Sequence, residues 1–382
     1  MLFTLREDEI KMTVNIDVRN VRSNQADEMY ISATPNVTAP ILEQWKEIFS
    51  RIRDILLSKK AYILQERIFG TKDAIESAYK QRLENYGVLD DKVPPAFLVC
   101  KEGLGGPAAG VQVHAIRCKN KPQVIYFDNN PSGRIVRTSD RTFLALSAIS
   151  APLSANPAEQ AKSMLEKAVS ILANYDADFS DVPRTWMWLG DILSWYEQFN
   201  AVRNNFFIEQ GIIAKKTNQS LPASTGIGLS PDDNAACAMD LVAVIEPPHS
   251  IKYLPSAGKQ HCAYEYGSAF SRATLASTPA AKTIFISGTA AIDINGATTN
   301  IGDPLGQIKE TIENARAVLR DTNCTDKDVS QAIAYCKTID VQRVFNEFKK
   351  DLHWPVISVV CDICRPELLF EIEAAALIKN SK

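Results

Sequence analysis

PAEQAKSMLEKAVSILANYDADFSDVPRTWMWLGDI (residues 157–192) and PLGQIKETIENARAVLRDTNCTDKDVSQAIAYCKTI (residues 304–339) are two versions of one stretch, and they decide the fold. They align without a gap at an offset of 147 residues, so that Leu172 meets Leu319. Each begins with apolar residues at helical spacing and continues, after a polar turn, into a second short element. The match predicts an internal repeat.

Strand-like runs flank both copies. TFLALSAI (142–149) precedes the first and TIFISGTAAI (283–292) precedes the second, and a Pro-led segment and an apolar strand follow each copy. We therefore expect an α+β fold with two tandem units, each a mixed sheet packed by two helices. The expected divisions are an N-terminal extension at 1–95, a first unit at 96–250 and a C-terminal unit at 251–382.

The chain before the first repeat contains fewer signals. Residues 39–60 have apolar side chains at helical spacing and are expected to cap one edge of the sheet. Residues 96–117 resemble a hairpin that leads into the first unit. The GLGG within them (103–106) is not followed by the Lys-Ser/Thr of a phosphate-binding loop, so we expect no nucleotide site there.

The composition excludes several function classes. Charged residues make up 23% of the 382 residues and leave a formal net charge of −3, which gives no electrostatic basis for binding nucleic acid or an anionic membrane. No apolar run reaches the length of a membrane span. Residues 1–12 have no long apolar segment behind basic residues, which is unlike a signal peptide. We expect a cytoplasmic protein.

The cysteines are expected to be reduced thiols. Eight are scattered through a long chain without an export signal, and the four histidines are isolated. The CxxC formed by Cys361 and Cys364 lies in a β-branched run and has no second ligand pair at zinc spacing. We therefore expect neither a metal site nor a redox role at this CxxC.

The C-terminal unit resembles the RidA/YjgF superfamily, and the whole chain resembles the chorismatases, which carry such a unit at the C-terminus. The resemblance covers most of residues 96–382. Its motifs are GVQVHA (110–115), WYEQFNAVRNNFF (195–207), LPASTGIG (221–228), YGSAFSRATL (266–275), SGTAAI (287–292) and CRPELLFEIEA (364–374).

This resemblance implies RidA/YjgF-like (chorismate mutase-like) units and a cofactor-independent reaction on chorismate. Cleaving the enolpyruvyl ether of this dianion requires a proton on its methylene carbon and cations for two carboxylates. The products are pyruvate and either a hydroxybenzoate or a dihydroxy-cyclohexadiene carboxylate. We expect chorismate as the partner, with no nucleic acid or membrane, and a monomer or small homo-oligomer.

Glu371 is the candidate acid. It lies between Phe370 and Ile372 in an apolar strand, and alternation places Glu371 and Glu373 on one face. Burial of a carboxyl favours its neutral, proton-bearing form. An outward-facing, solvated Glu371 is the alternative, and the resemblance favours the acid because chorismatases use the glutamate at this place as proton donor. Glu373 is interpreted as structural or solvated.

Arginines suit the substrate carboxylates because their planar fork binds a carboxylate with two hydrogen bonds. The resemblance implies Arg203 and Arg272 in this role, with Arg365 as a weaker candidate and Arg184 weaker still. Hydroxyl groups complete the expected site, either as hydrogen-bond donors or in turns that hold an anion. These are Tyr196, Tyr266, Thr225 and Thr289.

Two residues bear on the product. The chorismatases that form 3-hydroxybenzoate resemble this chain in having a cysteine at Cys364, but they tend to have glycine where this chain has Ala273. We favour 3-hydroxybenzoate, with the dihydroxy acid left open. One rival is a RidA-like enamine or imine hydrolase, although Val356 replaces the arginine of that group. Another is a non-catalytic module that binds a small carboxylate, because the Gly-His of many members is missing after the SGTA strand.

Overall fold

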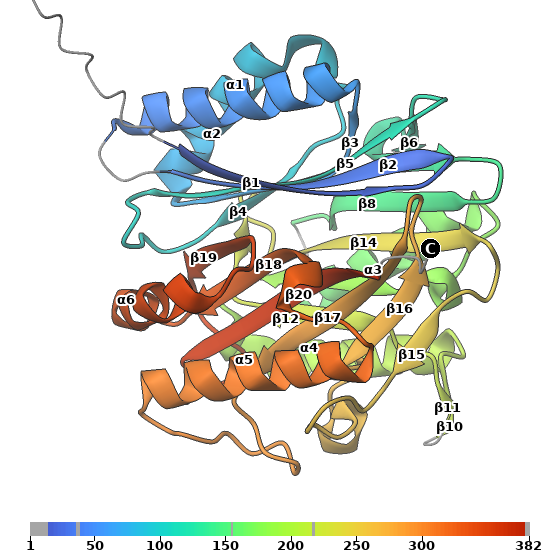
Figure 1. Ribbon diagram of the computed structural model, residues 1–382. Coiled ribbons are helices and arrows are strands. Elements are labelled where there is room, and N and C mark those ends of the chain that lie inside the picture. Colours follow the sequence, from blue (N-terminus) through green and yellow to red (C-terminus); the bar gives the residue numbers. More distant parts are fainter. Residues whose placement is uncertain (1–13, 36–38, 154–155, 216–217, 379–382) are drawn as a thin grey trace, which may run out of the picture.

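The computed structural model describes residues 14–35, 39–153, 156–215 and 218–378. Within them the chain forms three six-stranded sheets, each with two long helices (Figure 1). No helix in these ranges combines the length and the apolar character needed to cross a bilayer. Residues 1–12, on which the expectation about a signal peptide depends, lie outside the described residues.

The two repeated units have the same strand order. The middle sheet runs β12-β9-β14-β8-β7-β6, and the C-terminal sheet runs β19-β18-β20-β17-β16-β15. The middle unit consists of β6 (Gln123–Phe127), β7 (Asn130–Arg137), β8 (Thr142–Ser150), α3 (Pro157–Ala173), β9 (Arg184–Leu189), α4 (Ile192–Glu209), the small ribbon β10 (Ile213–Lys215) and β11 (Asn218–Gln219), β12 (Ala223–Ile227) and β14 (Cys237–Glu246). The C-terminal unit consists of β15 (Lys252–Leu254), β16 (Ala273–Ser277), β17 (Lys282–Ala290), α5 (Pro304–Asp321), β18 (Val329–Cys336), α6 (Ile339–Phe348), β19 (Val356–Val360) and β20 (Phe370–Ile378).

The internal repeat is confirmed element by element. Helices α3 and α5 begin at Pro157 and Pro304, and α4 and α6 begin at Ile192 and Ile339, so both pairs keep the offset of 147. Each first helix begins with a proline at a position where a missing N–H costs nothing, behind a side chain that caps the helix. The expected α+β fold with two tandem units, each a mixed sheet packed by two helices, is therefore present.

The N-terminal residues correct the expectation of an extension. They form a third sheet in the order β1-β2-β5-β3-β4-β13, whose first five strands repeat the order β7-β8-β14-β9-β12 of the middle sheet, while β13 is an additional edge strand. Its elements are β1 (Val14–Arg22), β2 (Ala26–Pro35), α1 (Ile41–Lys59), β3 (Tyr62–Gly70), α2 (Lys72–Tyr86), β4 (Ala96–Val99), β5 (Ala108–Cys118) and, from the middle part of the chain, β13 (Ser230–Pro231). Helix α1 matches the expected helix, but it covers its own sheet rather than an edge of another.

The expected hairpin at 96–117 is also corrected. Strand β4 pairs in parallel with β3, whereas β5 is inserted between β2 and β3 and pairs antiparallel with both. The apolar centre of β5, Val111 to Ile116, is buried and belongs in the middle of a sheet rather than in an edge hairpin. The first sheet therefore continues to Cys118, beyond the boundary expected at residue 95.

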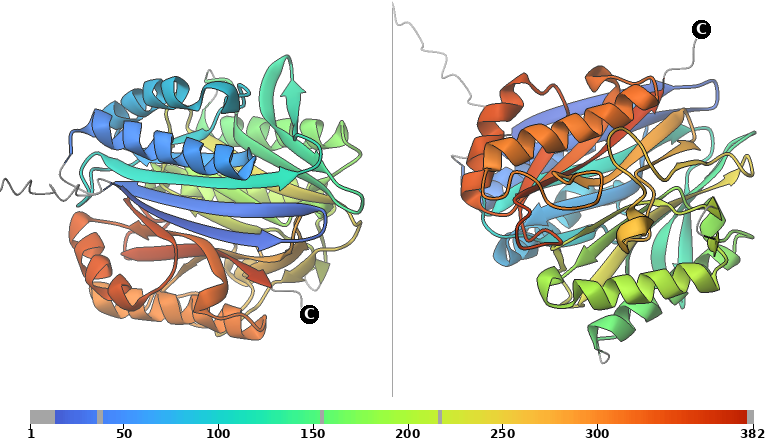
Figure 2. Two further views of the ribbon diagram at one scale, coloured as in Figure 1. Left: turned by 45° about the horizontal axis from the view of Figure 1, so that its top comes forward. Right: turned by 90° about the horizontal axis from the view of Figure 1, so that it is seen from below.

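The helices lie on the outside of the molecule and the sheets face one another inside (Figures 1 and 2). Each helix pair packs on the outer face of its own sheet and forms a separate apolar core. A fourth core lies between the inner faces of all three sheets and includes Phe69, Trp188, Phe285 and Tyr335. Because this core is shared, the three units pack as one body.

Buried polar groups join the sheets at corresponding places. Arg67 of the first sheet pairs with Asp240 of the middle sheet, Nε to Oδ2, at 2.8 Å. Arg184 of the middle sheet pairs with Glu373 of the C-terminal sheet, Nη2 to Oε2, also at 2.8 Å. At the third junction, Gln331 donates its amide to the backbone of the first sheet. Buried ionic groups of this kind need partners, and here each charge has one.

Candidate active site

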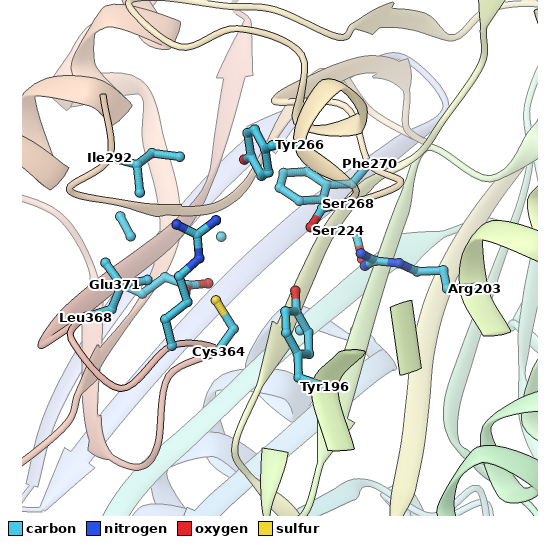
Figure 3. Close-up of a pocket in the computed structure, with 14 residues that line it drawn as sticks. Tyr196, Arg203, Ser224, Tyr266, Ser268, Phe270, Ile292, Cys364, Leu368 and Glu371 are labelled. Carbon is cyan, nitrogen blue, oxygen red and sulfur yellow. The ribbon is translucent and has the colours of Figure 1, made fainter. Parts of the chain in front are cut away.

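A cavity lies at the junction of the middle and C-terminal sheets (Figure 3). Its empty space, about 540 Å³, includes volume that is open to solvent. The middle unit contributes side chains from α4 and β12, and the C-terminal unit contributes β17, β20 and the loops before β16 and β20. The lining residues are Tyr196, Arg203, Ser224, Gly226, Tyr266, Ser268, Phe270, Gly288, Ala290, Ile292, Cys364, Arg365, Leu368 and Glu371.

Glu371 is the buried acid of this cavity. It is 5% exposed and stands in β20 between Ala290 of β17 and Tyr335 of β18. Among the described residues, no side chain or backbone group donates a hydrogen bond to its carboxyl oxygens. The pKa of Glu371 is raised from 4.5 to about 8, mainly by burial and also by the negative charge of Glu373, although Arg184 and Arg365 act in the opposite direction. At neutral pH the group therefore carries its proton.

Glycine at position 288 makes room for this carboxyl. The pairing of β17 with β20 shifts register between Ile286 and Thr289, so β17 is irregular at Gly288. A methyl group at Gly288 would overlap Oε1 of Glu371. The acid thus lies directly against the backbone of the neighbouring strand.

Arg203 is a buried cation without an acidic partner. It lies on α4, is 1% exposed, and donates from Nη2 to Oδ1 of Asn200 at 2.7 Å. Its Nε has no hydrogen-bond partner among the residues described, and no carboxylate lies within 4 Å of it there. A buried guanidinium in this state is costly unless an anion binds it. Figure 3 shows Arg203 and Glu371 on opposite sides of the cavity, with Tyr196 and Cys364 between them.

A second guanidinium lines the cavity from the loop before β20. Arg365 donates from Nη1 to the carbonyl of Gly296 at 2.5 Å and lies over the ring of Tyr266. In the described part of the chain, it forms no ion pair either. The cavity therefore has two cations facing it and one carboxyl that is neutral at pH 7.

Comparison with solved structures identifies the architecture. A chorismatase crystal structure matches 95% of this chain and 98% of its own, with a TM-score of 0.59 and 18% sequence identity. The chain has the fold of a chorismatase. A YjgF/YER057c/UK114 family member from Mycobacterium tuberculosis matches 34% of the chain (TM-score 0.26, 20% identity), and a Rid family protein from Yersinia pestis matches 28% (TM-score 0.26, 19% identity). No protein-family model matches the chain, and no curated protein matches it in sequence.

Within this chorismatase fold, the sequence-based candidates fall into three groups. Six line the cavity, including Cys364 in the loop before β20; the others are Glu371, Arg203, Arg365, Tyr266 and Tyr196. Burial raises the pKa of the Cys364 thiol to about 12 and also raises the pKa values of both phenols, so all three groups are neutral at pH 7.

Arg272 lies one side chain away from the cavity. Its Nη2 donates to the hydroxyl of Tyr266 at 2.6 Å, and its Nε donates to the carbonyl of His261 at 2.9 Å. It is not among the lining residues, so the expected direct contact with a ligand is replaced by contact through Tyr266. The reason is local: Phe270, two residues earlier, fills the cavity wall, and the guanidinium lies 5.4 Å from that ring.

Three further candidates are buried around the cavity without lining it. The hydroxyl of Thr225 accepts hydrogen bonds from Arg184 at 2.6 Å and from the backbone N–H of Gly288 at 3.0 Å. The hydroxyl of Thr289 donates to the carbonyl of Ser287 in its own strand. Ala273 is fully buried at the start of β16. These three side chains lie behind the residues that line the cavity, so they do not contact its open space directly.

The two cysteines of the CxxC have different surroundings. Strand β19 ends at Val360, so both follow the expected strand. Cys361 is buried in the core shared by the sheets, whereas Cys364 faces the cavity. No group of three potential metal ligands occurs among the described residues. Both are free thiols.

Sequence reasoning missed the packing partners of the acid. Glu373, interpreted as structural or solvated, is 5% exposed and pairs with Arg184 and with the indole N–H of Trp186 at 2.6 Å. Ser268 and Phe270 were also missed as wall residues. Both lie inside the YGSAFSRATL motif, which was the available signal.

Proposed function

We propose that the chain is a chorismatase, which cleaves the enolpyruvyl ether of chorismate to pyruvate and a hydroxybenzoate or dihydroxy-cyclohexadiene carboxylate. One observation carries the proposal: a buried carboxyl that holds its proton at neutral pH faces a cavity with an unpaired, fully buried guanidinium. An acid and cations are what the cleavage of a dianionic enol ether requires. The shared fold with a chorismatase supports the same function.

In the proposed reaction, Glu371 donates its proton to the terminal methylene carbon of the enolpyruvyl group. Protonation of this carbon converts the enol ether into an oxocarbenium ion, and a nucleophile then adds to that ion. Capture by water leads to pyruvate and the dihydroxy acid, so one water is consumed. Capture by the ring hydroxyl leads to pyruvate and 3-hydroxybenzoate without net addition of water. In both cases a proton released by the nucleophile or ring restores Glu371.

In the proposed complex, each of the two arginines binds one carboxylate of chorismate. Arg365 lies close enough to Glu371 to influence its charge, so it suits the carboxylate of the enolpyruvyl group that receives the proton. Arg203 lies across the cavity and suits the ring carboxylate. We propose 3-hydroxybenzoate as the favoured product because Cys364 occupies the wall between them.

The test is incubation of the purified protein with chorismate, with pyruvate followed in a coupled assay and the aromatic products identified by mass spectrometry. Pyruvate release with either ring product supports the proposal. Ammonia release from 2-aminoacrylate without pyruvate from chorismate would instead indicate an enamine or imine hydrolase. A thermal shift with chorismate but no turnover would indicate a binding module.

A further inference from the structure

The mechanism proposed above leaves one buried ion pair unused, and this pair adjoins the acid. Glu373 follows Glu371 by two residues in β20, so both side chains lie on the same face of the strand. Both oxygens of Glu373 are held: Oε2 accepts from Arg184 Nη2 at 2.8 Å, and Oε1 accepts from Trp186 Nε1 at 2.6 Å. Two donors of this kind hold the carboxylate in one position.

The same arginine reaches the strand that faces Glu371. Nη2 of Arg184 also donates to the hydroxyl of Thr225 at 2.6 Å, and this hydroxyl accepts the backbone N–H of Gly288 at 3.0 Å. Gly288 is the residue whose missing side chain leaves space for Oε1 of Glu371. Arg184 therefore connects a fixed negative charge on one side of the acid with the irregular part of β17 on the other.

We propose that Arg184, Glu373 and Thr225 form a positioning device for Glu371, in which the Glu373 carboxylate keeps the proton on Glu371 and Thr225 holds Gly288 away from its oxygen. The inference rests on the proposed function for its meaning in catalysis. None of the three residues lines the cavity, so they act on the substrate only through Glu371.

The surroundings of Glu371 show why Glu373 matters. Of the charged neighbours, Glu373 disfavours ionisation of Glu371, whereas Arg184 and Arg365 favour it. The remaining titratable groups near the acid are thiols and phenols with raised pKa values, which are neutral at pH 7. They are Tyr196, Tyr335, Cys361 and Cys364. Glu373 is thus the anion that offsets the two guanidiniums beside the acid.

The fold supplies a matched control at another sheet junction. Asp240 pairs with Trp186 in the middle sheet, and Glu373 pairs with Ile333 in the C-terminal sheet. Trp186 and Ile333 are equivalent positions of the repeat, 147 residues apart, so Asp240 and Glu373 occupy corresponding places. Asp240 is also fully buried and also pairs with an arginine, Arg67, at 2.8 Å. Two residues before Asp240, however, stands Ala238, so this pair has no neighbouring acid on its strand.

The experiment compares Glu373→Gln with Asp240→Asn. The protonation of Glu371 is titrated directly by the infrared carboxyl band that disappears in Glu371→Gln, and the pH dependence of kcat/KM for pyruvate release is recorded alongside. We expect Glu373→Gln to lower the midpoint of both titrations by about one pH unit or more, because it removes the anion and leaves the guanidiniums. Asp240→Asn should leave both midpoints unchanged.

An unchanged midpoint in folded Glu373→Gln, or an equal shift in Asp240→Asn, would overturn the inference. The infrared titration needs no substrate and therefore tests the inference even in a protein that does not turn over chorismate. Absence of turnover would refute the proposed function alone. If Glu373→Gln does not fold, Trp186→Phe removes one donor that offsets the charge of Glu373 and should raise the midpoint instead, because the anion beside Glu371 is then less compensated. Thr225→Val should lower kcat about tenfold or more without moving the midpoint of the titration. Thr225→Ser, which keeps the hydroxyl, should restore kcat.

Discussion

Replacing the acid by its neutral isostere should stabilise the protein at neutral pH. The pKa of Glu371 is about 8 in the folded chain, above its ordinary value of 4.5. A carboxyl whose pKa is raised by folding contributes its full stability below the unfolded pKa and loses it progressively as pH rises from the unfolded pKa through the folded pKa. Glu371→Gln carries no charge in either state and escapes this loss.

The size of the effect follows from the two pKa values. Between pH 4.5 and pH 7 lie 2.5 pH units, and about 1.4 kcal/mol for each gives roughly 3 to 4 kcal/mol in favour of Glu371→Gln at pH 7. With an unfolding entropy of about 2 cal/mol/K per residue, 382 residues give a rise in Tm of about 4 °C. At pH 4 the two proteins should have the same Tm.

The assay is thermal unfolding of the wild type and Glu371→Gln by calorimetry at pH 4, 5.5 and 7. The control is Glu367→Gln, which neutralises an exposed carboxylate four residues earlier and should leave the Tm difference independent of pH. Equal Tm values for wild type and Glu371→Gln at pH 7, or a more stable wild type, would refute the assignment of Glu371 as a buried, proton-bearing acid.

Four further outcomes follow from the same geometry. In the wild type, kcat/KM for pyruvate release should be level below pH 8 and fall about tenfold per pH unit above it, as Glu371 loses its proton; a constant rate to pH 10 would contradict this. Gly288→Ala should lower kcat by about 10²-fold, measured in the same assay, because its methyl group overlaps Oε1 of Glu371. Arg203→Met should raise KM for chorismate about 10- to 100-fold with a smaller change in kcat, since a charged hydrogen bond is lost. Cys364→Ala should increase the share of dihydroxy acid over 3-hydroxybenzoate in the mass spectrum, and an unchanged ratio would remove Cys364 from product control.

The sequence predicted the parts of the fold that recur within it. The offset between Pro157 and Pro304 predicts where α3 and α5 begin, because proline and the preceding capping residue specify a helix start locally. The unit formed by the first sheet was not predicted. Residues 14–118 show no gapless match to the other two copies, and β5 pairs with two strands that lie far earlier in the chain.

The candidate site was predicted to a similar extent. The resemblance to the chorismatases, rather than the strand pattern alone, favoured a buried Glu371, which is 5% exposed, and the motif residues Arg203 and Cys364 line the same cavity. The partnership of Glu373 with Arg184 was missed because the two residues lie 189 positions apart on different sheets. No local pattern indicates which buried charges meet across a junction between sheets, since that depends on how the sheets pack.

The most direct test of the central claim is pyruvate release from chorismate by the wild type and by Glu371→Gln, measured at pH 7 at saturating substrate. The account predicts turnover by the wild type, and a loss of at least about 10²-fold in the variant, with chorismate still bound. Near-normal pyruvate release by Glu371→Gln would show that the proton comes from elsewhere and would contradict the account.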